Sequence, residues 1–299
     1  MSSIRVNPYP MPDILDALEK LQQQQDTATL ELSTGSTINK PSDNPAGAAE
    51  QVMVQESSSL NDTYQQSISS ITGQLSTAQS TLSSVVTALQ RAISLGTEGA
   101  NGTLSDSDRA DLSEEVSGIQ SQLVSLANTS YQGQYIFAGT ANTQPFVVDS
   151  QSASGVSYNG NQGTNSVAIG AGYSVQVNLP GSQVFSQPGA DVFQAINDLI
   201  NALNTNTNIG STVSEVSDAL NNVSAQQAFF GNALNQTQAQ QTYLGTEKVD
   251  LSQEQNAISA ADVSIVASQV SSDSTALNAT LSAIADIPQN SLFDYLSKM

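Results

Sequence analysis

A regular spacing of residues between Ser211 and Ile284 constrains the fold of this chain more than any other feature. In its first part, the members of one stripe follow each other in steps of three and four: Val213, Val216, Leu220, Val223, Gln227, Phe230, Leu234, Thr237, Gln241 and Leu244. Such a heptad spacing turns one stripe of a helix toward other helices. No proline interrupts this segment. The sequence therefore predicts a long helix that needs partner helices, either from elsewhere in the chain or from other chains.

The stripe changes phase toward its C-terminal end. Leu251, Ile258 and Ile265 continue the first phase, after which a second set takes over: Val266, Val270, Leu277, Leu281 and Ile284. We interpret this change as a stutter, which alters the supercoil locally without ending the helix.

A second narrow stripe lies near the N-terminus, where Ile14, Leu18, Leu21, Gln25, Ala28 and Leu32 follow in steps of four and three. Asp13 is a candidate N-cap for this helix. Gln25 would place a polar group on the stripe, which lowers stability and can fix the register of a coiled coil. A fraying amphipathic segment is the alternative. Because both ends of the chain carry narrow stripes, we expect them to pair with each other or with neighbouring copies.

Helix start and stop signals divide the first half of the chain. Gly35 ends the first helix, and Asn44 with Pro45 supplies an N-cap and a first helical residue for the next. That second helix is carried by Tyr64, Ile68, Ile71, Leu75, Ala78, Leu82, Val85, Leu89 and Ala92. A third helix begins at Ser105 or Asp106. The acidic residues in its first turns suit the helix dipole and lack the ligand spacing of a calcium loop.

The hydrophobic period changes from 3.6 to 2 at Tyr131, which predicts a mainly antiparallel β-domain over residues 134–187. Asn159-Gly160 predicts a type I′ hairpin turn, and Pro180-Gly181 predicts another turn. A short helix then follows with Val192 and Ile196 on its apolar face.

Composition excludes several classes of function. The chain has no histidine and no cysteine, which excludes thiol and imidazole catalysis and the usual zinc, haem and iron–sulfur sites. Carboxylate catalysis would need paired acids in a cleft, and the β-region offers only Asp149 before Asp191. We therefore expect no enzyme, no cofactor and no metal.

Charge and hydropathy restrict the partners. Seven Lys and Arg stand against 27 Asp and Glu, giving a net charge of −20, so nucleic acid and anionic membranes are poor partners. No apolar run approaches the roughly 20 residues of a membrane span, and residues 1–12 lack the apolar core of a secretory signal peptide. These features are typical of a structural protein that assembles.

Four stretches carry a resemblance to a known family. They are residues 32–49, residues 133–140 with Pro145 and Phe146, the helical C-terminal region, and Ser291-Leu-Phe-Asp-Tyr-Leu296. With these stretches the chain resembles the flagellin superfamily and, within it, the flagellar hook–filament junction proteins; flagellin itself is the alternative. Residues 2–12 are richer in proline than flagellin starts usually are, which leaves the first contact residues open.

The resemblance implies a mainly α fold with a small β-rich insert. A coiled-coil stem built from both termini, an α-helical core domain and an outer antiparallel β-domain are expected. On the residues of this chain, the stem would comprise 1–44 and 251–299, the core 45–133 and 188–250, and the outer domain 134–187.

The resemblance also implies a role and partners. The chain would be exported by the flagellar type III apparatus, with an export chaperone, and would assemble with itself, the first hook-associated protein and flagellin. The candidate contact residues for assembly are Ile14, Leu18, Leu21, Leu32, Asn44, Pro45, Val266, Val270, Leu277, Leu281, Ile284, Leu292, Phe293 and Leu296.

Overall fold

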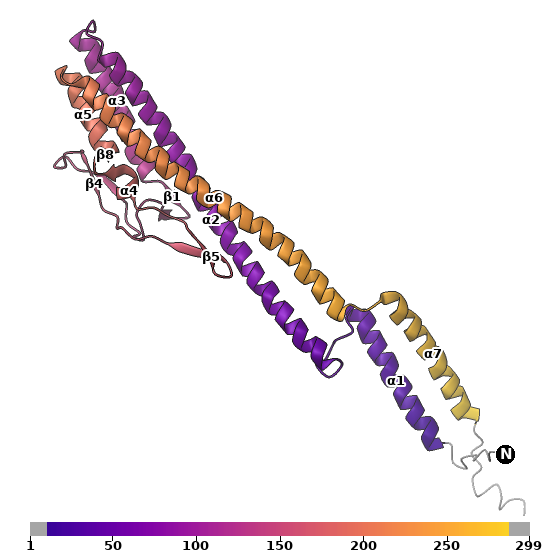
Figure 1. Cartoon of the computed structure of the whole chain (residues 1–299). Coiled ribbons are helices and arrows are strands. Elements are labelled where there is room, and N and C mark those ends of the chain that lie inside the picture. Colours follow the sequence, from indigo (N-terminus) through magenta and orange to yellow (C-terminus); the bar gives the residue numbers. More distant parts are fainter. Residues whose placement is uncertain (1–10, 287–299) are drawn as a thin grey trace, which may run out of the picture. The chain divides into compact units, whose positions relative to one another are not determined.

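The computed structural model describes residues 11–286, and their contacts divide the chain into two units. Unit 1 combines the two ends of the chain, residues 1–59 and 248–299, and unit 2 comprises residues 60–247. The described helices are α1 (Met11–Thr34), α2 (Pro45–Gly99), α3 (Asp106–Ala127), α4 (Gly181–Phe185), α5 (Val192–Thr205), α6 (Ile209–Ser259) and α7 (Val263–Asp286). Helices α2 and α6 contribute residues to both units (Figure 1).

The strands are short and form two-stranded antiparallel sheets, four in the described residues. They are β1 (Ser130–Tyr131), β2 (Gln134–Tyr135), β3 (Phe146–Val148), β4 (Val156–Tyr158), β5 (Ser166–Gly170), β6 (Tyr173–Gln176), β7 (Ser186–Gln187) and β8 (Ala190–Asp191). Each odd-numbered strand pairs with the strand that follows it. The fold is therefore mainly α with a small β-rich insert, as the sequence predicted.

In unit 2 the predicted helical stripes are buried. On α2, every predicted position from Ile68 to Ala92 is buried, and Tyr64 packs against the same core. On α6, the predicted positions from Val213 to Leu244 are buried or half-buried, with Gln241 as the exception. Of the two predicted cap candidates, Ser105 caps α3: its hydroxyl accepts from the Asp108 backbone N–H at 3.2 Å. Helices α3 and α5 pack against each other and complete the helical core.

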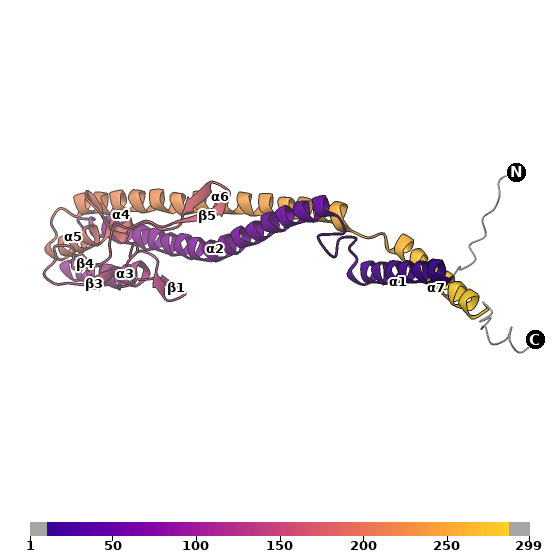
Figure 2. The same ribbon diagram turned by 90° about the horizontal axis from the view of Figure 1, so that it is seen from below.

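The β-region of unit 2 shares this core. Phe137, Phe146 and Phe185 come from the β-region, and they meet Phe193 of α5 and Phe230 of α6. Asn128, directly after α3, holds the Phe146 backbone with two hydrogen bonds of 2.8 and 2.9 Å. Figure 2 shows β3 and β4 beside α3. Burial of aromatic rings against helices positions these short strands, since a two-stranded hairpin is marginal by itself.

Two turn predictions in the β-region are wrong. Asn159-Gly160 follows β4 but does not join paired strands, because β4 pairs backward with β3 and β5 pairs forward with β6. Gly160 instead lies against the Tyr158 ring, and the Tyr158 hydroxyl donates to the Phe137 or Asn161 carbonyl. Pro180-Gly181 starts the short helix α4. In both places, packing around a buried aromatic core overrides the local turn signal.

Unit 1 contains an antiparallel pair of helices, α1 and α7, joined at one end, besides the start of α2 and the end of α6. Helix α1 lies beside α7 along much of their lengths (Figure 1). Ser36 after α1 forms an antiparallel bridge with Ala260 before α7. The Thr37 N–H donates to the Ser259 carbonyl at 2.7 Å, and the Ala261 N–H donates to the Gly35 carbonyl at 2.9 Å. These bonds anchor the loop after α1 to the residues before α7.

The interpretation of one helix from Ser211 to Ile284 is wrong, because the helix ends at Ser259 and a new one begins at Val263. The phase change predicted near Ile265 is therefore a break and not a stutter. Asp262 starts the new helix: its Oδ1 accepts from the N–H groups of Ser264 and Ile265 at 2.9 and 3.2 Å. Ile265, expected on the stripe, is exposed.

Candidate assembly interface

The α1–α7 pair of unit 1 buries little of its own apolar surface. Among the described residues of unit 1, the fully buried apolar side chains are Ala28, Ile38, Val54 and Val266. Exposed apolar side chains in the same unit are Leu15, Leu30, Leu32, Val52, Met53, Val249, Val263, Ile265 and Leu281. Apolar surface gathered on one part of a molecule marks a site of interaction with a partner. The geometry of unit 1 is thus that of an incomplete helical bundle.

The predicted contact residues of the two helices occupy three environments. Val266 is buried, and Ile14, Leu18, Leu21, Val270, Leu277 and Ile284 are half-buried between the helices or at the edge of the pair. Leu281 is 44% exposed and Leu32 is 38% exposed, so neither lies in the seam of this pair. For Leu32 the expected seam position is wrong, because Glu31 takes the half-buried place after Ala28. Leu292, Phe293 and Leu296 lie outside the described residues.

Asn44 and Pro45 form the start of α2. The Asn44 Oδ1 accepts from the Gly47 backbone N–H at 3.0 Å, and Pro45 is the first helical residue. This arrangement confirms the predicted cap, in which an amide oxygen satisfies an orphan N–H and proline presets the backbone. Asp43 fixes the preceding turn, since its carboxylate accepts from the Asn39 and Lys40 N–H groups at 3.0 and 2.8 Å.

Sequence reasoning missed a carboxylate inside the seam. Asp273 is only 4% exposed, and with Gln269 and residues of α1 it lines a groove of about 510 Å³. The signal was present, because Asp273 lies three residues beyond Val270 and four before Leu277, which is a stripe position. The apolar neighbours on the stripe, Val270 and Leu277, determined the prediction, and the charge between them was not used.

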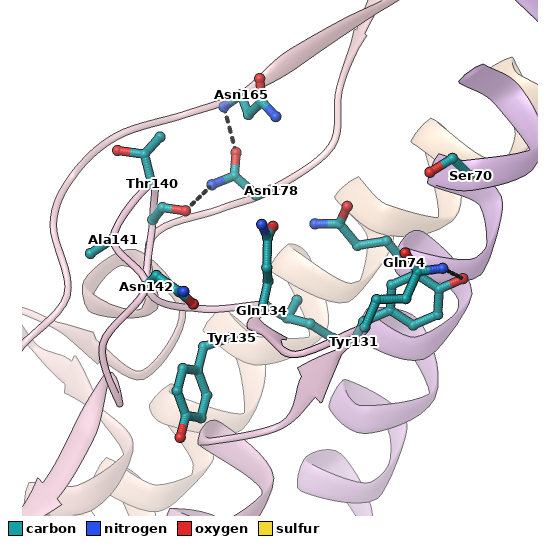
Figure 3. Close-up of a pocket in the computed structure, with 13 residues that line it drawn as sticks. Ser70, Gln74, Tyr131, Gln134, Tyr135, Thr140, Ala141, Asn142, Asn165 and Asn178 are labelled. Carbon is teal, nitrogen blue, oxygen red and sulfur yellow. Dashed lines mark hydrogen bonds between the residues drawn. The ribbon is translucent and has the colours of Figure 1, made fainter. Parts of the chain in front are cut away.

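Unit 2 holds a polar pocket of about 340 Å³ beside the β1–β2 hairpin (Figure 3). It is lined by Ser70, Gln74, Tyr131, Gln132, Gln134, Tyr135, Ile136, Gly139, Thr140, Ala141, Asn142, Asn165 and Asn178. Asn178 ties two loops together: its Oδ1 accepts from the Asn165 N–H at 2.6 Å and its Nδ2 donates to the Gly139 carbonyl at 2.9 Å. None of the lining residues is Asp, Glu, Lys or Arg, so this pocket offers hydrogen bonding rather than acid–base chemistry.

The groups with displaced pKa values belong to caps, turns and a surface pair. Burial raises the pKa of the Asp191 carboxyl, although that carboxylate caps α5 by accepting from the Gln194 N–H at 2.9 Å. Burial also raises the pKa of Tyr158. The Ser105 hydroxyl lowers the pKa of Asp108, and Asp16 raises the pKa of Lys20. None of these four groups lines the polar pocket of unit 2.

The described residues contain neither a metal-binding cluster nor a membrane-spanning helix. Residues 11–286 contain no group of three or more His, Cys, Asp or Glu side chains placed to hold a metal ion. In the same part of the chain, every helix is too short or too polar to cross a membrane.

Comparison with known proteins finds relatives of part of this chain. Residues 13–142, from α1 to the loop after β2, match the bacterial flagellin N-terminal helical region. Two curated proteins, both named flagellar hook-associated protein 3, match as well. The one from Salmonella typhimurium is 34% identical over 158 residues, and the one from Escherichia coli is 40% identical over 118 residues. In these segments this chain is similar to proteins of the flagellin superfamily.

The matched segments are partial. They cover 52% and 39% of this chain, and 48% and 37% of the Salmonella and Escherichia proteins, so the chain spans half or less of these relatives. A solved structure extends the likeness of fold: that of the flagellar junction protein FlgL from Legionella pneumophila, at 16% identity. It aligns with a TM-score of 0.61 over 71% of this chain and 100% of that one.

Proposed function

We propose that this chain is a structural component of the bacterial flagellum that joins the hook to the filament. The observation that carries the proposal is the match to two proteins named flagellar hook-associated protein 3, at 34% and 40% identity. The part of unit 1 described above supplies a physical basis. An incomplete bundle with exposed apolar side chains gains stability when copies or partners cover it.

The assembly contacts would come from unit 1. Ile14, Leu18 and Leu21 of α1 would complete a bundle with Val266, Val270, Leu277 and Ile284 of α7 and with helices of neighbours. Leu32 and Leu281 are exposed in the single chain, which suits side chains that a neighbour covers. Asn44 and Pro45 would fix the direction of α2 at the edge of this interface. Leu292, Phe293 and Leu296 complete the proposed set.

The proposed partners are further copies of this chain, the first hook-associated protein and flagellin. Export through the flagellar type III apparatus, with a chaperone in the cytoplasm, belongs to the same proposal and rests on the family resemblance. Catalysis is not part of this proposal, which concerns a structural role.

The five-part division of the chain is also proposed. Residues 1–44 and 251–299 would form the stem, 45–133 and 188–250 the core, and 134–187 the outer domain. The boundary of unit 1 at residue 248 supports the start of the C-terminal stem at 251, whereas at the N-terminal side unit 1 extends to residue 59. The shared aromatic core of 134–187 with α5 and α6 supports an outer domain that is tightly packed on the core.

Immunogold labelling of isolated hook–filament structures tests the proposal. An antibody against this chain should label a short zone between hook and filament, and deletion of the gene should leave hooks without filaments while flagellin appears in the medium. Re-expression of the wild-type chain from a plasmid is the control.

The second candidate is flagellin itself, because the matched family model is the flagellin N-terminal region. The two candidates differ in copy number. Label along the entire filament would identify a filament subunit and contradict the junction role, and label on neither structure would contradict both.

A further inference from the structure

The carboxylate of Asp273 is buried in the α1–α7 pair without a full set of partners. Its Oδ1 accepts a hydrogen bond of 2.7 Å from the Gln269 side chain, one helical turn earlier. Its Oδ2 has no hydrogen-bond partner within the described residues, although Asp273 is only 4% exposed. A buried carboxylate oxygen with no donor is costly, so such a group is usually paired or found at a site that awaits a partner.

The groove around Asp273 favours a positively charged occupant. Its charged lining residues are Lys20, Glu31 and Asp273. Lys20 is already engaged, because its ammonium pairs with Asp16 at 2.8 Å. Two carboxylates therefore face this groove with no cation of their own, and the space of about 510 Å³ admits a side chain from outside.

The chain holds one cation that lacks a partner among the described residues. Arg91 pairs with Glu115, Arg109 pairs with Asp106, and Lys20 pairs with Asp16. Lys248 also makes an interaction. Lys40 is exposed, and within residues 11–286 its ammonium makes no hydrogen bond or ion pair. Its backbone is held in place by Asp43, so the side chain projects from an ordered turn.

Lys40 and Asp273 lie on separate segments of unit 1 and do not pair in the single chain. The loop that carries Lys40 is bonded to residues 259–261, before α7 begins at Val263. Asp273 lies ten residues into that helix, about 15 Å along its axis. The described residues of the single chain form no ion pair between Lys40 and Asp273, so we place the pair between two copies.

We propose that Lys40 of one copy of this chain enters the groove between α1 and α7 of a second copy and pairs with Asp273. The inference rests on the proposed assembly function and adds the residues of one contact. The contact gives the Asp273 carboxylate a cationic partner and places a cation among copies that each carry a net charge of −20. An ion pair of this kind sets register and orientation between subunits, because a shifted copy leaves both charges unpaired.

Disulfide cross-linking tests the contact directly, since the chain has no cysteine of its own. A subunit with Lys40→Cys and Asp273→Cys is assembled into flagella and mildly oxidised. Non-reducing gels of isolated hook–filament structures should show a dimer of this chain, and oxidised monomer should show none. The matched control is Lys40→Cys with Ser272→Cys, since Ser272 is the exposed neighbour of Asp273 on α7. The control should cross-link at least tenfold less.

Absence of the dimer in assembled flagella overturns the inference, as does equal cross-linking of the control or a cross-link to a different protein. If the doubly substituted chain does not assemble alone, it is co-expressed with wild-type chain, and the mixed flagella are oxidised and judged in the same way.

Charge exchange gives a second, independent readout. Lys40→Asp should reduce the fraction of cells with attached filaments several-fold, and adding Asp273→Lys to the same chain should restore most of it. No restoration, with both variants present in the assembled structures at the wild-type level, overturns the inference. Asp273→Asn removes the charge and keeps the shape of the side chain. Filament attachment in this variant should depend less on salt concentration than in the wild type, because the ion pair that salt screens is gone.

The failure of this contact is distinguishable from a failure of the proposed function. If immunogold still labels a zone at the hook tip while the Lys40–Asp273 dimer is absent, the contact is wrong and the junction role stands. If no label is found on the flagellum at all, the junction role is wrong.

Discussion

Unit 1 and unit 2 use the same heptad spacing with opposite results. In unit 2 the stripe of α2 is buried from Ile68 to Ala92, because α3, α5, α6 and the phenylalanines of the β-region converge on it. In unit 1 the stripes of α1 and α7 meet only each other, and most of their apolar residues stay half-buried or exposed. The spacing sets the direction in which a stripe faces, and the number of elements that reach it sets how much of it is covered.

The largest expected effect lies in the core of unit 2. Phe137→Ala should lower the free energy of unfolding by about 3–5 kcal/mol, because it removes a fully buried ring. That ring contacts Phe185 at 5.1 Å and Phe230 at 6.4 Å between centroids. Urea unfolding followed by circular dichroism measures the loss. Val148→Ala is the control, since Val148 is 74% exposed and should change stability by less than about 0.5 kcal/mol. Equal effects would mean that the aromatic cluster is not the core.

In unit 1, removal of apolar side chains should affect assembly far more than folding. Leu277→Ala with Leu281→Ala truncates one half-buried and one exposed residue of α7. We expect the main thermal transition of the purified chain to move by less than about 4 °C, since unit 2 is untouched. Export should be normal, and flagellin should appear in the medium as unattached protein.

A melting temperature that falls much further would place these leucines in the core of the single chain. The contrast between the two units would then be wrong. Loss of export, by contrast, would indicate that the same face of α7 is required before assembly.

Two helix caps, one in each unit, allow a matched comparison with an expected effect of intermediate size. Asn44→Ala in unit 1 and Asp191→Ala in unit 2 each remove a side-chain acceptor for a backbone N–H, which costs about 1 kcal/mol. We expect the second to lower the main unfolding midpoint. The first should instead accelerate amide exchange in the first turn of α2 without moving the main transition. Asn44→Ser keeps an acceptor and is the control. A shift of the main transition by Asn44→Ala would show that the two units unfold together.

The smallest expected effect is a pH dependence in unit 2. Burial raises the pKa of Asp191 above its ordinary 3.8, so the folded state binds this proton more tightly than the unfolded state. The stability that this proton supplies is full below pH 3.8 and is lost as the pH rises from there through the raised folded pKa. Asp191→Asn keeps a good N-cap and removes the titration. We compare the free energies of unfolding of the variant and the wild type at each pH. On going from pH 3.5 to pH 7, we expect this difference to shift in favour of the variant by about 0.5 kcal/mol or less.

Denaturant midpoints at the two pH values measure this difference. If the variant instead becomes less stable relative to the wild type as the pH rises, the folded state favours the charged form of Asp191. Its cap bonds would then outweigh its burial.

The sequence predicted helices well where signals of different kind agreed. Asn44 with Pro45, and Ser105 before α3, are cap signals that the structure bears out atom by atom. The predicted hairpin turn at Asn159-Gly160 was wrong. The local turn preference of a dipeptide is weaker than the packing of Tyr158 with the phenylalanines around it. The break before Val263 was missed although Asp262 is a good cap residue, since the stripe alone was followed there.

For the candidate interface, the sequence by itself determined which stripes exist and where a charged residue interrupts them. Apolar spacing is a local property of the chain, and it fixes the faces of α1 and α7 whatever surrounds them. Only the tertiary structure decided that Leu32 and Leu281 stay exposed and that Asp273 Oδ2 lacks a donor within the described residues. Burial and hydrogen bonding depend on which distant segments arrive at a face, and that is a property of the packed molecule rather than of any stretch of its sequence.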